Sequence, residues 1–272
     1  MTPSPPDFLA RIVASRRLRI AEMQLARPTA TLEAAIPHGR SAGRLAAALR
    51  RGGGSQPLRL LCEVKRASPS RGMLDPDVDP VALATLYEAA GASAVSLVTE
   101  PDHFLGEPAW MDAVRPHVAL PLLLKDFVVD RYQLLDASAR GADAVLLLAA
   151  VLDRSHMREL IQEGVALGLD TLVEIHEPSE LDEALAAQAR IIGINNRSLR
   201  TFEVDLGTSV ALLPQLPADV VAVAESGLSR REDLLRLRET RCDAVLMGEV
   251  FMTSSDRRQT LAHLLAAARG DA

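Results

Sequence analysis

Eight short apolar runs recur along most of this 272-residue chain, and most of its unusual polar residues lie where a run ends. The runs are rich in Val, Leu and Ile with little alternation, which is typical of strands buried on both faces. The predicted strands are 59–65, 93–98, 121–124, 143–148, 171–175, 190–194, 220–224 and 243–247. Helical stretches lie between them. Because the carboxyl ends of parallel strands meet at one face, the polar residues there predict a shared site.

A faint internal repeat supports this interpretation. A helix end, a tight turn and a new strand follow one another near residues 91, 141, 168 and 241. Such a repeat indicates that one βα unit is used many times. Sequential right-handed units either close into a barrel or open into a doubly wound sheet, and eight of them favour a (βα)8 TIM barrel.

The helical stretches carry recognisable start signals. We predict helices at 79–90, 131–140, 153–167 and 229–238. Asp79, Asp130, Asp153 and Ser229 are the expected caps, because short polar side chains accept hydrogen bonds from the first free backbone N–H groups. Gly168 is the expected stop of the third helix.

Residues 1–57 stand outside the repeat. We therefore expect an N-terminal helical extension that packs on a barrel formed by residues 58–272, as a single domain. A barrel of this kind needs about 250 residues, which the chain supplies. Residues 7–27 predict an amphipathic helix, and we interpret its arginines as a solvated face rather than a surface for an acidic partner. Residues 52–57 predict a flexible joint.

Composition excludes several classes of function. A net charge of -6 argues against nucleic-acid binding. The longest apolar run, 144–152, is half of the roughly 18 residues that a membrane span needs. The first residues show no signal peptide, and two cysteines, Cys62 and Cys242, give neither a metal spacing nor a disulfide framework. We expect a reduced, cytoplasmic enzyme without membrane or nucleic-acid partners.

Four charged residues at strand ends are the first candidates for chemistry. Glu63 and Lys65 close the first strand and point the same way, which inside a barrel is inward near the mouth. Lys125 and Glu174 close the third and fifth strands and should meet them there. Buried charges of this kind are costly unless they are paired or functional. A salt-bridge network that only plugs the barrel is the alternative.

Two glycine-containing turns suggest a phosphate site. Ser226 and Gly227 follow the seventh strand, and Gly248 follows the eighth. In barrels of this type these two loops commonly bind phosphate through backbone N–H groups, and glycine lets the main chain approach an anion closely. The alternative is that both glycines only turn the chain.

The segment after the first strand, 67–76, is long and contains Pro and Gly. We interpret it as a mobile lid that brings Ser68 and Arg71 to an anionic substrate, because it is dense in anion-binding side chains. A disordered surface loop is the alternative.

Six motifs occur together and in order. They are Glu-Val-Lys-Arg-Ala-Ser-Pro-Ser-Arg-Gly (63–72), Leu-Lys-Asp-Phe (124–127), Val-Glu-Ile-His (173–176), Ile-Gly-Ile-Asn-Asn-Arg (192–197), Thr-Phe-Glu-Val-Asp (201–205) and Glu-Ser-Gly (225–227). With them the chain resembles the indole-3-glycerol-phosphate synthase family from about residue 8 to 265. The resemblance implies a (βα)8 barrel with an N-terminal extension. It also implies a carboxy-lyase of tryptophan biosynthesis, without metal or organic cofactor, that acts on 1-(2-carboxyphenylamino)-1-deoxyribulose 5-phosphate.

The resemblance assigns roles to the strand-end residues. Lys125 matches the general acid that activates the ribulose carbonyl, and Lys65 holds the substrate carboxylate and shares acid work in the dehydration. Glu174 matches the carboxylate beside the cationic intermediate, with a base role. The supporting residues are Glu63, Asn195 and Ser226. How the lysines and the glutamates divide the acid and base roles stays open.

Further positions match the substrate-binding residues of the family. Arg197 is expected to help Gly227 and Gly248 with the phosphate, and Phe104 and Phe127 to flank the anthranilate ring. Core packing is the alternative for Phe127.

The chain also departs from relatives at two positions. Glu249 stands where some relatives have Ser, and it is expected to bind the phosphate through its backbone N–H. Its carboxylate would repel phosphate unless it points away. Leu124 stands where many relatives have Arg, and should face away from the site.

Two other functions compete with this one. Phosphoribosylanthranilate isomerase has a similar fold, but it uses a Cys and an Asp, and the Glu-Val-Lys end of the first strand disfavours it. A non-catalytic barrel that only binds a ligand is disfavoured by the intact strand-end residues. His176 follows Glu174 by two residues and is expected near the site, whereas the other histidines form no metal set. We expect a phosphorylated small-molecule substrate and a monomer or weak homodimer.

Overall fold

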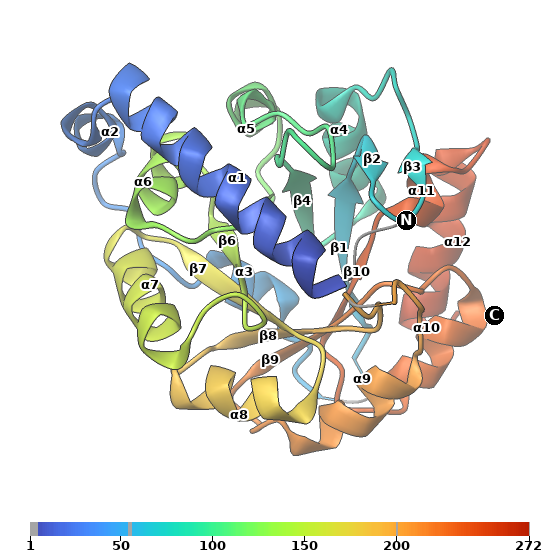
Figure 1. Cartoon of the computed structure of the whole chain (residues 1–272). Coiled ribbons are helices and arrows are strands. Elements are labelled where there is room, and N and C mark those ends of the chain that lie inside the picture. The colour runs from blue at the N-terminus through green and yellow to red at the C-terminus, as the bar shows by residue number, and fades with distance from the viewer. Residues whose placement is uncertain (1–4, 54–55, 200, 272) are drawn as a thin grey trace.

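The computed structural model describes residues 5–53, 56–199 and 201–271, and its centre is a closed barrel of parallel strands (Figure 1). The barrel strands are β1 (Arg59–Val64), β4 (Ala94–Val98), β5 (Leu122–Lys125), β6 (Ala144–Leu148), β7 (Asp170–Ile175), β8 (Ile191–Asn195), β9 (Val221–Glu225) and β10 (Ala244–Met247). Each pairs in parallel with its neighbour, and β1 closes the ring by pairing with both β4 and β10. The TIM-barrel prediction is confirmed, and every predicted strand lies within two residues of its observed bounds.

Successive side chains of each strand point alternately into the barrel and toward the helices, so the protein has two apolar clusters, one inside the barrel and one around it. On β1, Leu61 belongs to the cluster inside the barrel, whereas Cys62 belongs to the larger cluster between the strands and the helices. Glu63 therefore shares the inward face with Leu61, as the period of two requires. Leu124 on β5 also lies in the outer cluster, so it faces away from the barrel interior, as expected.

Helices surround the barrel. Their bounds are α4 (Pro80–Ala90), α5 (Ala109–Val114), the short 3-10 helix η1 (Arg115–His117), α6 (Arg131–Ala139), α7 (Arg154–Ala166), α8 (Pro178–Ala186), α9 (Gly207–Leu212), η2 (Leu213–Gln215), α10 (Arg231–Arg238), α11 (Glu249–Met252) and α12 (Arg257–Arg269). A two-residue hairpin pair, β2 (Ala67–Ser68) and β3 (Gly72–Met73), forms in the segment after β1.

Three of the four predicted helix caps are confirmed. The side chains of Asp79, Asp130 and Asp153 accept hydrogen bonds from backbone N–H groups in the first turns of α4, α6 and α7. Ser229 was the wrong residue for α10. The Asp233 carboxylate reaches back from the first turn and accepts from the backbone N–H groups of Ser229 and Arg230, so the acidic residue does the capping.

The N-terminal extension starts at the mouth of the barrel. Its first helix, α1 (Pro5–Ala26), runs diagonally across the front of the barrel in the view of Figure 1. Arg16 is almost fully buried and lies 2.7 Å from the carboxylate of Asp126, directly after β5. Ser15 and Arg19 contact Asp102, after β4. Together these contacts hold α1 over the mouth.

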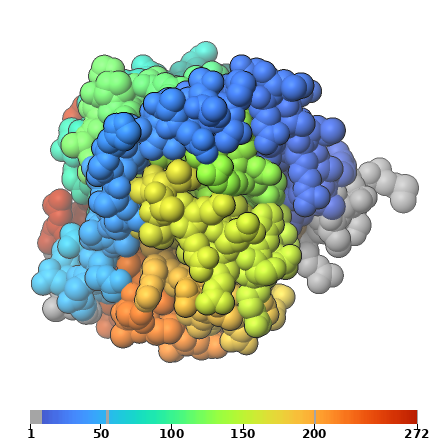
Figure 2. Space-filling model, turned by 90° about the vertical axis from the view of Figure 1, so that its left-hand side faces the viewer, coloured from blue at the N-terminus to red at the C-terminus, as the bar shows by residue number. Residues whose placement is uncertain are grey.

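The remainder of the extension passes down the outside to the opposite end. Helix α2 (Thr29–Ala35) packs on α6, and α3 (Arg44–Leu49) follows. Leu45 and Leu49 of α3 join the apolar cluster inside the barrel, and Asp170 of β7 accepts hydrogen bonds from three backbone N–H groups at the start of α3. Figure 2 shows this blue segment passing above and beside the yellow-green surface around α7. Of the predicted joint at 52–57, residues 54 and 55 lie outside the described residues.

Candidate active site

The mouth of the barrel gathers two lysines and three buried carboxylates from different strands. Glu63 comes from β1, Lys125 from β5, Glu174 from β7 and Glu225 from β9, with Lys65 directly after β1. The Lys125 Nζ lies 2.8 Å from Glu225 Oε2, 3.4 Å from Glu63 Oε2 and 3.9 Å from Glu174 Oε2. Lys65 Nζ lies 2.7 Å from Glu63 Oε1. Strand-end positions far apart in the sequence therefore form one charged group.

Burial and mutual charge set the proton affinities of this group. Burial opposes the charged form of Lys125, but the carboxylates of Glu225, Glu63 and Glu174 outweigh it and raise the lysine pKa. Burial likewise opposes ionisation of Glu63, but Lys65 and Lys125 outweigh it, so its pKa is lowered. Lys125 therefore faces the mouth as an ammonium group held by anions.

The two carboxylates on β7 and β9 are driven apart in proton affinity. Burial opposes the ionisation of Glu174, but His176 and Lys125 outweigh it and lower its pKa to about 2. Burial raises the pKa of Glu225 to about 7, because Lys125 offsets it only in part and the charge of Glu174 adds to it. Two neighbouring carboxyl groups with opposite shifts are a common basis for dividing acid and base roles.

Glu225 was missing from the predicted site residues. The sequence marks it as the end of the seventh strand, but a single Glu before Ser-Gly gives no further signal. Its Oε1 is buried without a hydrogen-bond partner. A Cβ on Gly193 of the neighbouring β8 would lie 2.0 Å from that oxygen, so glycine there leaves the room that Glu225 occupies. That glycine in the Ile-Gly-Ile-Asn motif is the signal that could have indicated it.

Two asparagines at the end of β8, Asn195 and Asn196, have different hydrogen-bond partners. Asn195 Nδ2 donates to Glu174 Oε1 at 2.9 Å, and Asn195 Oδ1 accepts from the backbone N–H of Arg197. Asn196 is buried and serves the main chain: it donates to the carbonyl of Glu225 and accepts from Ser209. Only Asn195 faces the charged group.

The predicted phosphate side lies at the ends of β8, β9 and β10. Ser226 has a φ of 65° and Gly227 a φ of 76°, so the chain turns sharply after β9. A Cβ on Gly227 would lie 2.2 Å from Val204, and one on Gly248 would lie 2.7 Å from Glu63 Oε1. Each glycine thus has a packing reason of its own, and a role in phosphate binding stays a prediction.

Glu249 does not present a free carboxylate. Its oxygens lie 2.7 Å from the Arg71 guanidinium and 3.3 Å from that of Arg197. This links the β2–β3 hairpin to the end of β8. Ser68, within the hairpin, has a buried hydroxyl without a hydrogen-bond partner. The hairpin therefore carries one unsatisfied donor and one arginine that is held by an anion of the protein itself.

Phe104 and Phe127 form an aromatic pair beside the mouth, with ring centroids 6.1 Å apart. Both rings are half-buried. Buried Glu100, which the sequence did not single out, accepts from the backbone N–H groups of Asp102, His103 and Phe104. That carboxylate shapes the loop that carries the first of the two rings.

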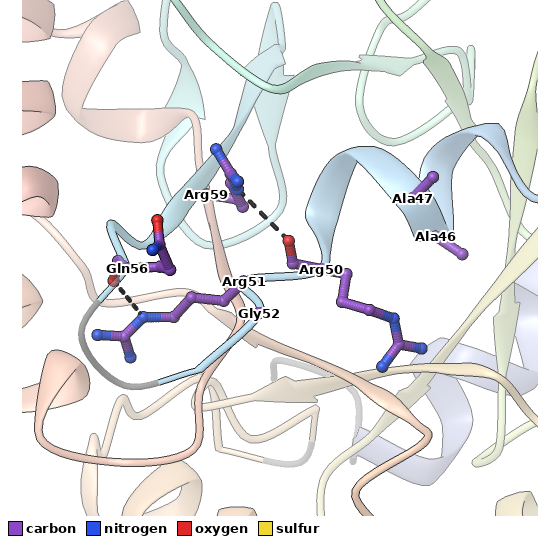
Figure 3. Close-up of a pocket in the computed structure, with 7 residues that line it drawn as sticks. All are labelled: Ala46, Ala47, Arg50, Arg51, Gly52, Gln56 and Arg59. Atoms are coloured by element: carbon purple, nitrogen blue, oxygen red, sulfur yellow. Dashed lines mark hydrogen bonds between the residues drawn. The ribbon is translucent and has the colours of Figure 1, made fainter.

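The opposite end of the barrel has a hollow of about 730 Å³ lined by arginines (Figure 3). It lies beside the end of α3, and its guanidinium groups point away from one another. Arg50 donates to the carbonyl of Asp219, and Arg51 to those of Gln56 and Arg238. The side chains of these arginines donate hydrogen bonds to backbone carbonyl groups. Such a structural role is typical of the stability face of a barrel rather than of its active site.

The described ranges lack two features, a membrane-spanning helix and a metal site. No helix in residues 5–53, 56–199 and 201–271 has the length and apolarity to cross a membrane. The same residues contain no group of three or more His, Cys, Asp or Glu side chains with the arrangement of a metal site.

Comparison with known proteins gives one consistent family. Residues 9–264 match the family model described as indole-3-glycerol phosphate synthase. A protein of that name from Chlorobium chlorochromatii is 39% identical over 254 residues, covering 93% of this chain and 98% of the relative. Another, indole-3-glycerol phosphate synthase 1 from Streptomyces coelicolor, is 41% identical over 261 residues, covering 96% of both.

Solved structures with lower identity show the same fold. The structure of KGPDC from Streptococcus mutans has a TM-score of 0.61 at 11% identity and covers 79% of this chain and 99% of that one. A mandelate oxidase variant has a TM-score of 0.61 at 15% identity, covering 85% of this chain and 87% of that one. At such identities the likeness concerns the barrel alone.

Proposed function

Because the chain belongs to the indole-3-glycerol phosphate synthase family, we propose that the mouth of its barrel closes the indole ring with Lys125 as the acid. The protein is a carboxy-lyase of tryptophan biosynthesis. The reaction converts 1-(2-carboxyphenylamino)-1-deoxyribulose 5-phosphate into indole-3-glycerol phosphate, CO2 and water. A carbon–carbon bond forms between the anthranilate ring and ribulose C2, the carboxyl group leaves as CO2, and the former C2 oxygen leaves as water.

The position of Lys125 supports its role. The ribulose carbonyl becomes electrophilic when its oxygen takes a proton, and Lys125 is the ammonium group surrounded by Glu63, Glu174 and Glu225. Ring closure with loss of CO2 from a carboxylate consumes one proton overall, so Lys125 must be reprotonated in each cycle. Glu225, 2.8 Å away and with a pKa raised to about 7 by burial, is suited to carry that proton.

Glu174 and Lys65 take the electrostatic roles. An ionised Glu174 stabilises the cation that follows ring closure and accepts the ring proton as the indole becomes aromatic. Its low pKa suits the first task, because the group stays an anion throughout the usual pH range. Lys65, held 2.7 Å from Glu63, faces the mouth and binds the substrate carboxylate. Asn195 and Ser226 orient Glu174 and the substrate hydroxyls.

The substrate phosphate is assigned to the ends of β8 to β10. Ser68 and Arg197 supply side-chain donors, and Gly227, Gly248 and Glu249 supply backbone N–H groups. The unsatisfied Ser68 hydroxyl supports this assignment. Phe104 and Phe127 flank the anthranilate ring, which their mutual spacing at the mouth supports. We further propose that the enzyme works in the cytoplasm as a monomer or weak homodimer, in keeping with the free, buried thiols of Cys62 and Cys242.

The single observation that carries this assignment is the convergence of Lys125 with three buried carboxylates. We expect Lys125→Met to lower kcat by about 100-fold or more, the usual scale for loss of an acid. Product is followed by the fluorescence of indole-3-glycerol phosphate with the purified ribulose substrate. Far-UV circular dichroism checks the fold of the variant. Turnover close to wild type in a folded Lys125→Met protein would remove Lys125 from the mechanism.

A further inference from the structure

Two further ionisable side chains, His176 and Glu180, lie in a row behind the carboxylate of Glu174. His176 directly follows β7, its side chain is only 12% exposed, and its Nε2 lies 3.3 Å from Glu174 Oε1. On its other side, Nδ1 lies 3.3 Å from Glu180 Oε2. The same Glu180 oxygen accepts the backbone N–H of His176 at 2.5 Å. The imidazole is therefore held between two carboxylates, one in the site and one outside it.

The local sequence explains this arrangement. Glu180 lies in the first turn of α8, which begins at Pro178 directly behind β7. An acid in the first turn is favoured by the helix dipole, and here it also closes the turn that carries His176. The strand end and the start of the next helix thus form one unit that fixes the ring. Nε2 is buried and makes no aligned hydrogen bond, so its contact with Glu174 is an ion pair rather than a directed bond.

The other groups around Glu174 give its ionised form little support, so a cation at His176 matters. From β5, Lys125 approaches Glu174 Oε2 at 3.9 Å, but the same ammonium is 2.8 Å from Glu225. From β8, Asn195 contributes only a neutral amide. From β9, Glu225 adds negative charge when it is ionised. Lys125 alone would therefore favour an ionised Glu225 over an ionised Glu174, because it lies closer to Glu225.

We propose that His176, backed by Glu180, is a positioning residue that holds Glu174 as the ionised member of the buried carboxylate pair and leaves the proton on Glu225. This inference rests on the role of Glu174 proposed above. The proton affinities agree with it: despite burial, the two carboxylates raise the pKa of His176 to about 10, so the ring is an imidazolium at neutral pH. A proton kept on Glu225 also removes one anion beside Lys125, which makes that ammonium a stronger acid.

The test is the pH dependence of kcat in His176→Asn. An opposite charge at this distance lowers a carboxyl pKa by about one to three units. We expect its loss to move the acid limb of kcat, where Glu174 takes up a proton, to higher pH by about that amount. KM should change little, because the His176 ring contacts the carboxylates of Glu174 and Glu180 and is only 12% exposed. Glu180→Gln, which keeps the ring but weakens its charge, should shift the limb in the same direction by less.

A matched control and a direct observation keep the test decisive. His263→Asn, an exposed position on α12, should leave the pH profile unchanged. If His176→Asn fails to fold, 15N–1H spectra of the wild-type protein still report whether the His176 ring is doubly protonated up to about pH 9, as the inference requires. A neutral ring at pH 7, or a His176→Asn profile lowered equally at all pH values, would overturn it. Full activity of Glu174→Gln would instead refute the proposed function.

Discussion

At the scale of single residues, the most unusual feature is an ammonium group within 4 Å of three buried carboxylates. Lys125 neutralises charge that the barrel mouth would not otherwise accommodate. Three cationic side chains, Lys65, Lys125 and His176, face the four carboxylates of Glu63, Glu174, Glu180 and Glu225. One proton must therefore be shared within the group, and Glu225 has the proton affinity to hold it near neutral pH. The ionisation of Glu225 should therefore be visible in the kinetics.

We expect kcat to fall as pH rises through about 7, because Glu225 then loses the proton that strengthens and replenishes Lys125. The sign follows from the raised pKa: the protonated form is present below that value and lost above it. Glu225→Gln, which cannot ionise, should have a lower kcat and no such limb. The measurement is kcat from pH 5 to pH 9 by product fluorescence. An alkaline limb that persists in Glu225→Gln would assign the ionisation to another group.

Sequence reasoning identified most of this cluster and omitted one member. The period of two placed Glu63 and Lys65 on one face, and barrel topology brought Lys125 and Glu174 to the same end. Glu225 was not predicted as a site residue, because its position beside the other members depends on the register between β8 and β9, which aligns it with Asn195. No single strand shows that alignment. The catalytic roles of all these residues stay predictions.

At the scale of elements, the β2–β3 hairpin is joined to the rest of the mouth by the Glu249 carboxylate, which lies between Arg71 and Arg197. The concern that Glu249 would repel phosphate thus has a structural answer. The carboxylate already occupies a cationic environment, so a phosphate that binds there competes with it.

We therefore expect Glu249→Ser to strengthen competitive inhibition by inorganic phosphate. Partly exposed ion pairs contribute up to about 1 kcal/mol, which corresponds to a roughly fivefold lower inhibition constant. Glu239→Ser is the control, because it removes one exposed carboxylate at the far end of α10. Inhibition that is unchanged or weaker in Glu249→Ser would show that the carboxylate does not compete with phosphate.

Helix α1 is held over the mouth by a buried ion pair between Arg16 and Asp126, in which part of the guanidinium group has no hydrogen-bond partner. Arg16 Nε and NH1 are buried without hydrogen-bond partners, and burial raises the pKa of Asp126 to about 6 although Arg16 opposes it. Removing one partner of such a pair usually costs about 3–5 kcal/mol, whereas removing both is far less costly.

Arg16→Met should accordingly lower the free energy of unfolding by about 3–5 kcal/mol at pH 8. The loss should be smaller at pH 5, because the Asp126 carboxyl group is then mostly protonated and the substitution leaves little uncompensated charge. The sign follows from the raised pKa of Asp126: the native state binds more protons than the unfolded state, so its stability falls as pH rises through that range. The double variant Arg16→Met/Asp126→Asn should recover most of the loss. Urea denaturation at the two pH values measures each free energy, and additive losses in the double variant would argue against the coupling.

At the scale of the whole molecule, the extension contacts both ends of the barrel. Helix α1 lies over the mouth through Arg16, and α3 fills the opposite end with Leu45 and Leu49. The topology followed from the sequence because eight apolar runs with polar ends leave few alternatives. The path of the extension did not, since short helices with few apolar residues fit many surfaces. That residues 1–57 and 58–272 form one domain stays a prediction.

That prediction has a direct test. We expect urea unfolding followed by far-UV circular dichroism to coincide with unfolding followed by the fluorescence of Trp110, the only tryptophan, which lies in α5 of the barrel. Coincident curves are the mark of one cooperative unit. A loss of helical signal at lower urea than the Trp110 transition would indicate that the extension unfolds by itself.

The pairing of β1 with β10 bears on how the chain is made. A ribosome releases β1 long before β10, and at about 5–20 residues per second the delay is on the order of ten seconds. Throughout it, β1 exposes a row of backbone groups that neighbouring nascent chains can pair with. Translation that stops before β10 leaves β1 and β9 as open edges. Aggregation and proteolysis, not partial turnover, are the expected fate of such products.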